Sequence, residues 1–472
     1  MIEETEQKYI DELLQLLSIP SISKDKPKVL ECANWIQNYI SKTATSVELI
    51  ETDHNPLIIA YWKSESEITP QKTLLIYGHY DVQPLSKNHT EKWITPPFQP
   101  TIRDGRIFAR GAGDNKGQFF AYLCAIDTVI RDHSSVPIDI KLILDGDEEM
   151  GSPFLLEGMR KRPDFFSNID VCVVSDGPAN SLWKPSLELG VRGIMKLKMH
   201  LQTGKTDVHS GNFGGIQSNP AWDLIKILAT MRNENGTCLI DGFYDDLFEL
   251  PEGFIDSAGE LNRMFGGFQK ELELPYFGGE QNCSILEKVL LRPTFNILGF
   301  TSGNVGHDSR NIVPHVADVE IDIRLVPHQT SDKIEKLIRN HLQKLQKNKI
   351  YAQILSNCKI DITSFEDPYT TPLDNVYFKP IYRALQIGFG EDPVVFPIAG
   401  GTLPLDPLFK MIKCPIYCLP YAQPDENNHA PNENISIEWF IKGIKTSLAL
   451  FDELVKNPEL KPQKKGPICT IF

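Results

Sequence analysis

Short runs of apolar residues divide the first part of the chain. They are rich in Ile, Leu and Val, and they span residues 57–62, 73–77, 138–144 and 169–174. Their length, and the Pro, Gly and charged residues that bound them, are typical of buried strands. Apolar residues at helical spacing occupy residues 10–17, 28–41 and the stretch after Lys116. Strand and helix patterns that alternate in this way predict an α/β fold.

The pattern changes near residue 190. Apolar and polar residues alternate from Met195 to Leu201, which predicts a half-exposed strand. Asn219-Pro220 resembles the first two positions of a helix that extends to about residue 232. Strands at 294–300 and 317–326, a helix from Ser331 and a strand near 350–355 follow. This β-α-β-β-α-β order is the ferredoxin-like arrangement, with an insert at 233–292.

The α/β pattern resumes after residue 368. Helices are expected at 375–387 and 437–456, and strands at 394–397 and 415–420. The ferredoxin-like domain is therefore inserted into the first domain. We expect the first domain to comprise residues 1–189 and 369–458, the inserted domain 190–368, and a flexible basic tail 459–472.

Metal-ligating side chains follow the ends of four apolar runs. These residues are His79 and Asp81, Asp114, the pair Glu148 and Glu149, and Asp176. Open α/β sheets bind ligands beyond the carboxyl ends of their strands. Two adjacent glutamates on an extended backbone point in opposite directions, so one can bind a metal while the other acts as a general base. Each turn alone is typical of a solvated acidic loop, but four at equivalent positions indicate a site.

Several other classes of protein are disfavoured. The glycine-rich segment 109–117 lacks the P-loop pattern, and GxGxxG would need a glycine where Lys116 stands. A net charge of −14 argues against a nucleic-acid partner. The nine cysteines are scattered without metal-ribbon spacing, which is typical of reduced thiols in the cytoplasm. The acidic N-terminus has no signal-peptide pattern, and no apolar run is long enough to span a bilayer.

Five spaced motifs resemble those of the M20 family of metallopeptidases. They are GHYDV, ARGAGDNKG, DEEMGS, SDG and NNHAPNE, and they occur here in the family's order. DVHSGNFGG and DIRLVP, in the inserted domain, are most similar to the branch of carnosinases and cytosolic nonspecific dipeptidases. The resemblance implies a mixed-sheet α/β catalytic domain with a dinuclear metal site. It also implies that the inserted ferredoxin-like α+β domain is a lid and dimerisation domain, so we expect a homodimer.

The resemblance also implies a role for each site residue. His79 and Asp176 would bind one ion, Glu149 and His429 the other, and Asp114 would bridge them. Carboxylate and imidazole ligands suit Zn²⁺ or Mn²⁺. Glu148 would be the general base acting on the water between the two ions, and Asp81 would orient His79. The reaction would be hydrolysis of a peptide bond in dipeptides or short peptides with a free C-terminal carboxylate.

Further roles are implied for residues of the inserted domain and near position 400. His209 would help to stabilise the oxyanion in a partner subunit's active site, although a histidine in such a loop is often only a polar loop residue. Arg324 would bind the substrate carboxylate, and the alternative is an ion pair with Asp322 or Glu320. Asn311, Gly401 and Thr402 match weaker substrate-contact positions.

Two regions depart from the dipeptidase pattern. Pro397-Ile398-Ala399 precedes Gly400-Gly401 where the branch usually has an Arg-Glu pair, and the insert 233–292 matches poorly. Both regions would shape the substrate pocket. N-acyl amino acid deacylation, by the same mechanism, is therefore the alternative activity. The complete ligand set and Glu148 argue against a catalytically inactive relative.

The chain ends in the pattern Cys-a-a-X at Cys469. A terminal Phe favours geranylgeranylation, and the upstream lysines would add a second membrane signal. The alternative is an unmodified tail that carries this pattern by chance. We therefore expect a cytoplasmic protein that is membrane-anchored if Cys469 is prenylated.

Overall fold

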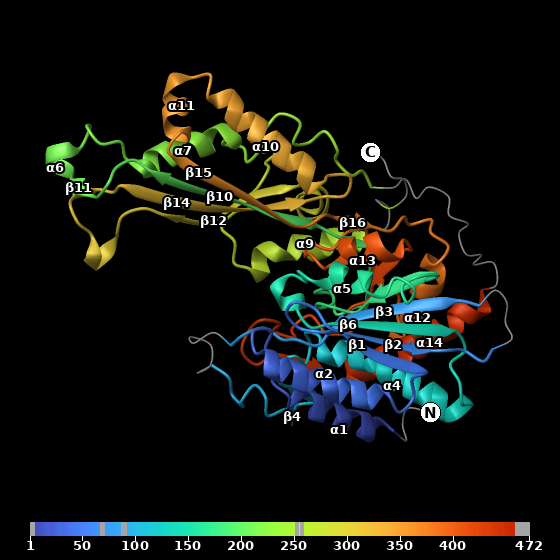
Figure 1. Cartoon of the computed structure of the whole chain (residues 1–472). Helices are drawn as coiled ribbons and strands as arrows, with labels where there is room; N and C mark the ends of the chain where they lie inside the picture. The colour runs from blue at the N-terminus through green and yellow to red at the C-terminus, as the bar shows by residue number, and fades with distance from the viewer. Residues whose placement is uncertain (1–4, 67–70, 86–91, 251–253, 255–258, 458–472) are drawn as a thin grey trace. The chain divides into compact units, whose positions relative to one another are not determined.

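The computed structural model describes residues 5–66, 71–85, 92–250, 254 and 259–457. The chain forms two compact units (Figure 1). The first comprises Met1–Gly190, Thr370–Pro397 and Pro404–Phe472, and the second comprises Val191–Tyr369 and Ile398–Leu403. β9 (Gly190–Val191) and β16 (Tyr369–Thr370) lie where the chain passes between the units. Cys469, the predicted lipidation site, lies outside the described residues.

The first unit is built on an eight-stranded sheet in the order β1-β2-β6-β3-β7-β18-β8-β17. Its strands are β1 (Ser46–Ile50), β2 (Leu57–Trp62), β3 (Thr73–His79), β6 (Asp139–Asp145), β7 (Val171–Val174), β8 (Ser186–Glu188), β17 (Val394–Phe396) and β18 (Ile416–Cys418). The central strands β6, β3, β7 and β18 are parallel, whereas β1 and β2 are antiparallel to their neighbours. β3 and β7 are buried along their whole length, as strands covered on both faces must be. The predicted α/β fold with a mixed sheet is confirmed.

Helices cover both faces of this sheet. One face packs in a single core with α1 (Glu6–Leu17), α2 (Lys26–Ile40), α4 (Lys116–His133), α12 (Phe378–Phe389) and α14 (Ile437–Lys456). Figure 1 shows α5 (Leu155–Arg160) and α13 (Leu405–Ile412) on the opposite face. A separate three-stranded sheet contains β4 (Thr101–Arg103), β5 (Arg106–Phe108) and β19 (Asn434–Ser436). No helix among the described residues is long and apolar enough to cross a membrane.

The second unit contains a four-stranded antiparallel sheet in the order β12-β14-β10-β15. Its main elements, in chain order, are β10 (Gly193–Gln202), α7 (Pro220–Met231), β12 (Thr294–Thr301), β14 (Val316–Leu325), α10 (Ser331–Leu345) and β15 (Cys358–Glu366). This order and topology are ferredoxin-like, as predicted. Inward residues of β10 and β14 pack with α7 and α10, and the alternate residues form a polar face.

Smaller elements complete the second unit. They are β11 (Val208–His209), α6 (Ser210–Phe213), α9 (Gly259–Glu271), the π-helical turn Glu287–Leu291, the 3₁₀ turn Gly306–Asp308, β13 (Ile312–Val313) and α11 (Lys349–Leu355). The strand predicted near 350–355 is wrong, because α11 occupies these residues. The Asn348 side chain accepts a hydrogen bond from the Ile350 amide and caps this helix. The last strand of the sheet follows as β15.

Candidate metal centre

Three neighbouring parallel strands of the first unit carry site residues at their carboxyl ends. β3 ends at His79, Glu148 and Glu149 follow β6, and Asp176 follows β7. The parallel order β6-β3-β7 therefore brings these turns to one edge of the sheet. Asp114 differs from the expectation, because β5 before it belongs to the small three-stranded sheet. Asp114 instead reaches the same edge from the loop that leads into α4.

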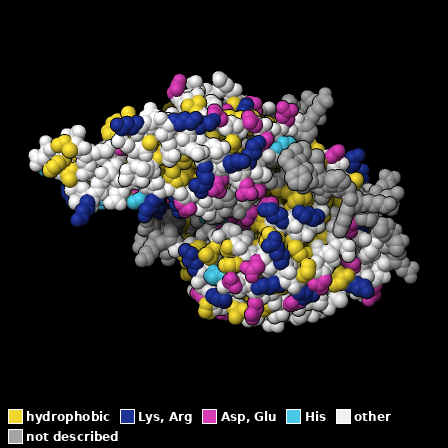
Figure 2. Space-filling model, turned by 45° about the horizontal axis from the view of Figure 1, so that its top comes forward, with side chains coloured by type: hydrophobic (Ala, Val, Ile, Leu, Met, Phe, Trp, Pro, Cys, Tyr) yellow, Lys and Arg dark blue, Asp and Glu magenta, His cyan; other side chains and the backbone are white. Residues whose placement is uncertain are grey.

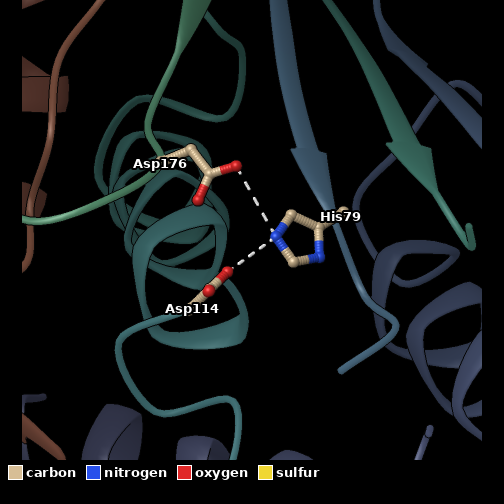
Figure 3. A group of neighbouring side chains, drawn as sticks. All are labelled: His79, Asp114 and Asp176. Carbon is tan, nitrogen blue, oxygen red and sulfur yellow. Dashed lines mark hydrogen bonds and ion pairs between the residues drawn. The ribbon is translucent and has the colours of Figure 1, made fainter. Parts of the chain in front are cut away.

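His79, Asp114 and Asp176 form the first group of side chains that could hold a metal ion (Figure 3). The Nε2 atom of His79 lies 2.9 Å from Asp114 Oδ1 and 3.5 Å from Asp176 Oδ2. All three residues are buried. Gly78 permits this packing, because a Cβ there would lie 2.8 Å from the Cβ of Phe119 on α4.

Asp114, Glu149 and His429 form the second group. The Nε2 atom of His429 lies 3.0 Å from Asp114 Oδ2 and 3.1 Å from Glu149 Oε2. Asp114 thus faces one histidine with each carboxylate oxygen. In each group the three ligand atoms lie within 4.8 Å of one another. Two sets of imidazole and carboxylate donors that share one aspartate fit a pair of divalent cations.

The pKa shifts at this centre reflect burial together with crowded negative charge. Burial raises the pKa of Glu148 well above its ordinary value, and it raises that of Glu149 to about 7. Hydrogen bonds with Asp114 and Glu149 raise the pKa of His429 to about 10. Burial alone would lower the pKa of His79, but Asp176 and Asp114 raise it well above its ordinary value. These shifts favour the protonated, positively charged form of both histidines.

Glu148 and Glu149 lie in a 3₁₀ turn, Glu148–Met150, rather than on the extended backbone that we expected. The turn follows from the Asp81 carboxylate, which accepts hydrogen bonds from the Glu148 amide (3.1 Å) and the Glu149 amide (3.2 Å). The two glutamates still face different partners. Glu149 contacts His429, whereas Glu148 Oε2 lies 3.9 Å from His79 Nε2.

Asp81 contacts His79 as well as this turn. The Nδ1 atom of His79 lies 3.4 Å from the Asp81 carboxylate and 3.1 Å from the Asp81 carbonyl oxygen. Asp81 is fully buried. Asp81 therefore holds His79 and the glutamate turn together. Its contact with the turn was not predicted from the sequence.

Two buried residues of the sequence motifs were also not assigned in advance. Arg110 donates a 2.6 Å hydrogen bond to Glu433 Oε2. Glu433 Oε1 accepts from the amides of Gly113 (3.1 Å) and Asp114 (3.0 Å), so this ion pair holds the loop that carries Asp114. Both residues belong to quoted motifs, ARGAGDNKG and NNHAPNE, and their charges are the signal that could have pointed to them.

The predicted substrate residues lie in the second unit and form two groups. The Arg324 guanidinium donates to Thr402 Oγ1 (2.8 Å) and to Asp322 Oδ2 (3.2 Å). Gly401 is the neighbour of Thr402. His209 pairs with Ile312 next to Asn311, at the other end of the sheet. Asn311 and Ile312 shortly precede Val316, the first residue of β14, whereas Arg324 lies near the other end of this strand. Val316 and Arg324 are eight residues apart, roughly 25 Å along an extended strand, so the two groups are well separated.

Comparison with known proteins identifies the family. The model of Peptidase family M20/M25/M40 matches residues 75–453, most of the chain. The chain belongs to this family. The Beta-Ala-His dipeptidase of Rattus norvegicus is 30% identical over 405 residues, covering 85% of this chain and 80% of its own. The Cys-Gly metallodipeptidase of Schizosaccharomyces pombe is 26% identical, covering 96% of this chain and 97% of its own.

A solved structure of the same family has the same fold. The M20 family metallo-carboxypeptidase Sso-CP2 from Sulfolobus solfataricus has a TM-score of 0.83 and 31% sequence identity. The alignment covers 95% of this M20 chain and 99% of that structure. The predicted family, the predicted fold class and the assignment as a metallopeptidase are therefore confirmed.

Proposed function

We propose that this M20 metallopeptidase hydrolyses dipeptides that have a free C-terminal carboxylate. The observation that carries the proposal is the pair of ligand groups that meet at Asp114 beside Glu148. The relatives support the substrate class, since two of them are named for Beta-Ala-His and Cys-Gly dipeptides. The chain covers at least four fifths of both relatives' lengths.

The five ligands divide into two sets that share one residue. We assign His79 and Asp176 to one cation and Glu149 and His429 to the other, with Asp114 between them. Their donor atoms suit Zn²⁺ or Mn²⁺. When bound, the pair of cations lowers the pKa of water and stabilises negative charge in the transition state.

Glu148 is assigned as the general base. Its side chain is 16% exposed, so it reaches solvent while burial keeps it poorly solvated. Burial raises the pKa of Glu148, which makes its carboxylate a stronger base, and nearby cations would oppose that rise. Glu148 removes a proton from the attacking water and returns it to the leaving amine. Asp81 positions Glu148 through its backbone amide.

Arg324 is assigned to the substrate carboxylate. Its side chain is 27% exposed. It forms an ion pair with Asp322, the contact that was expected as the alternative to substrate binding. The pair leaves one terminal nitrogen of the guanidinium without a partner among the described residues. Thr402 and Gly401 lie beside it, and a guanidinium next to a hydroxyl suits a carboxylate. Asn311 lies beside His209 at the other end of the sheet, so its proposed substrate contact would be in a partner subunit's site.

The position of His209 supports a homodimer. Because His209 and Arg324 lie at opposite ends of the second unit's sheet, they cannot bind one small substrate in the same chain. We therefore assign His209 to a partner subunit's site, where it would stabilise the oxyanion. Apolar side chains are exposed along one edge of this unit, on the edge strand β12 and on α7, which packs against β14. They are Ile297 (48% exposed), Leu298 (51%), Trp222 (65%) and Ile225 (44%).

Such an apolar edge suits a partner subunit, because an unpaired edge strand is a ready template for pairing. We propose an association of two copies through this edge. No nucleic-acid partner is proposed, because Lys and Arg side chains are interspersed with Asp and Glu on the face seen in Figure 2. The free cysteines of the described chain are mostly buried, in keeping with a cytoplasmic protein. Prenylation of Cys469 would add a membrane anchor.

A matched substrate panel tests the proposal. The purified protein is incubated with β-Ala-His, Cys-Gly and Ala-Leu, with a longer peptide, and with N-acetyl and N-succinyl amino acids, each with Zn²⁺, Mn²⁺ or chelator. We expect cleavage of the dipeptides that chelator and Glu148→Gln abolish and that the control Glu157→Gln, on the exposed side of α5, leaves intact. Cleavage of the acyl amino acids alone would replace the proposal with deacylation.

A further inference from the structure

Arg192, between β9 and β10, is a buried arginine without a carboxylate partner among the described residues. It is 5% exposed, and one terminal nitrogen donates to the carbonyl oxygens of Lys288 (3.0 Å) and Arg292 (3.1 Å). Its Nε atom has no hydrogen-bond partner in the described chain. A buried guanidinium destabilises the fold unless its charge and its donors are satisfied, so an arginine at this position indicates a role other than stability.

The backbone of Arg192 holds the segment that carries Thr402. The Arg192 amide donates to the Gly401 carbonyl oxygen (3.1 Å), and the Arg192 carbonyl oxygen accepts from Thr402 Oγ1 (2.8 Å). The same Thr402 hydroxyl accepts the 2.8 Å hydrogen bond from Arg324. One hydroxyl, fixed in both its donor and its acceptor roles, therefore links Arg192 to Arg324.

Positive charge exceeds negative charge at this position. Ile194 lies opposite Arg324 in the sheet, so Arg192 and Arg324 are diagonal neighbours on the polar face. Asp322 balances one of them, and its Oδ1 atom has no partner among the described residues. Burial and the charge of Arg324 lower the pKa of Arg192 to about 10. One bound anion would balance the second guanidinium.

We propose that Arg192 is the positioning residue of the carboxylate site and that the last turn of the insert sets its position. Arg192 fixes Thr402, and Thr402 fixes Arg324, so the guanidinium stays aimed at the substrate carboxylate. The carbonyl oxygens of Lys288 and Arg292 fix Arg192 in turn, and they lie at and just after the turn Glu287–Leu291. The insert thereby tunes affinity for the C-terminal carboxylate. The inference rests on the proposed function, because it deepens the recognition of that group.

Substitutions along this chain of contacts test the inference. Arg192→Lys keeps the charge but cannot serve two carbonyl oxygens in the same way, and Thr402→Val removes the linking hydroxyl. KM and kcat are measured for Ala-Leu and for its C-terminal amide, which lacks the carboxylate. Because a hydrogen bond to a charged group is at stake, we expect KM for Ala-Leu to rise about 10- to 100-fold in each variant. The kcat value and the KM for the amide should stay nearly constant.

Further variants separate this role from general damage. Leu290→Ala loosens the turn from its buried side, since Leu290 is 1% exposed, and should also raise KM for Ala-Leu selectively. The control Arg339→Lys, on the exposed face of α10, should change neither constant. If Arg192→Lys fails to fold, Thr402→Val carries the test. Unchanged KM for Ala-Leu in the folded variants would overturn the role of Arg192. A wild-type protein that does not prefer the acid over the amide would instead overturn carboxylate recognition itself.

Discussion

The loop that carries Asp114 depends on one buried ion pair, so Glu433→Gln should damage both stability and metal binding. Glu433 is fully buried and accepts three hydrogen bonds, from Arg110 and from the amides of Gly113 and Asp114. A glutamine can still accept from the two amides. Its amide group, however, directs a donor at the Arg110 guanidinium, which is 3% exposed and loses its only counter-charge in the described chain.

The structure indicates the size of the effect. Removing one partner of a buried ion pair destabilises a protein by about 3–5 kcal/mol, because the other charge stays buried without compensation. Residues that hold a metal ligand in place contribute about 10- to 100-fold in metal affinity. We therefore expect Glu433→Gln to lower the free energy of unfolding, measured in urea, by about 3–5 kcal/mol. Its Zn²⁺ affinity, measured against a competing chelator, should fall about 10- to 100-fold.

Glu426 offers a matched control in the same part of the structure. It is buried like Glu433, with 1% exposure, but neither of its carboxylate oxygens has a hydrogen-bond partner in the described chain. Burial raises the pKa of Glu426 well above its ordinary value, so a neutral amide should replace it within about 1 kcal/mol. Arg110→Met combined with Glu433→Gln should recover part of the lost stability. If Glu433→Gln matches wild type in both stability and Zn²⁺ affinity, the ion pair does not position Asp114.

Three further predictions concern pH, the partner subunit and the exposed edge. Burial raises the pKa of Asp145 to about 7 in the folded state, so the metal-free protein loses stability as pH rises from the ordinary aspartate pKa of 3.8 towards 7. Asp145→Asn should remove this pH dependence and stabilise the folded state by on the order of 4 kcal/mol at pH 8, and an unchanged stability in urea across this pH range would contradict the prediction. His209→Ala and Glu148→Ala should each be nearly inactive. An equal mixture of the two variants should nevertheless recover about a quarter of wild-type activity, because mixed dimers form. If the mixture recovers no activity, the site lies within one chain. Leu298→Lys should shift sedimentation to a monomer and reduce activity with metal content unchanged, and a persistent dimer would exclude this edge.

Much of the fold could be predicted from local patterns. The predicted runs 57–62 and 73–77 are β2 and most of β3, and the last helix was predicted at its observed bounds, Ile437–Lys456. The error at 350–355 arose because a short apolar run has no period that separates strand from helix. Its Asn348 cap and the buried Ile354 and Leu355 settle the matter only in context.

The details of the centre depend on contacts between distant segments. Arg110 and Glu433 are 323 positions apart in the sequence, and nothing local indicates that they pair. The turn at Glu148 likewise depends on Asp81, which arrives from another strand. The candidate metal ligands could be predicted from the motifs, because metal chemistry restricts ligands to a few types of residue. Apart from Asp81, the residues that hold those ligands could not be predicted, since many kinds of buried polar residue can fill that role.

The crowded carboxylates at the centre argue that cations belong to the native structure. Asp114, Glu148, Glu149 and Asp176 converge on two histidines, and the raised pKa values of Glu148 and Glu149 show that the arrangement disfavours further negative charge. Without cations, protons on the histidines must offset that charge, and this compensation weakens as pH rises. Two bound cations would replace the protons, ionise the carboxylates and stabilise the folded state by mass action. The same ions that activate water would then also hold together the edge of the sheet on which the enzyme depends.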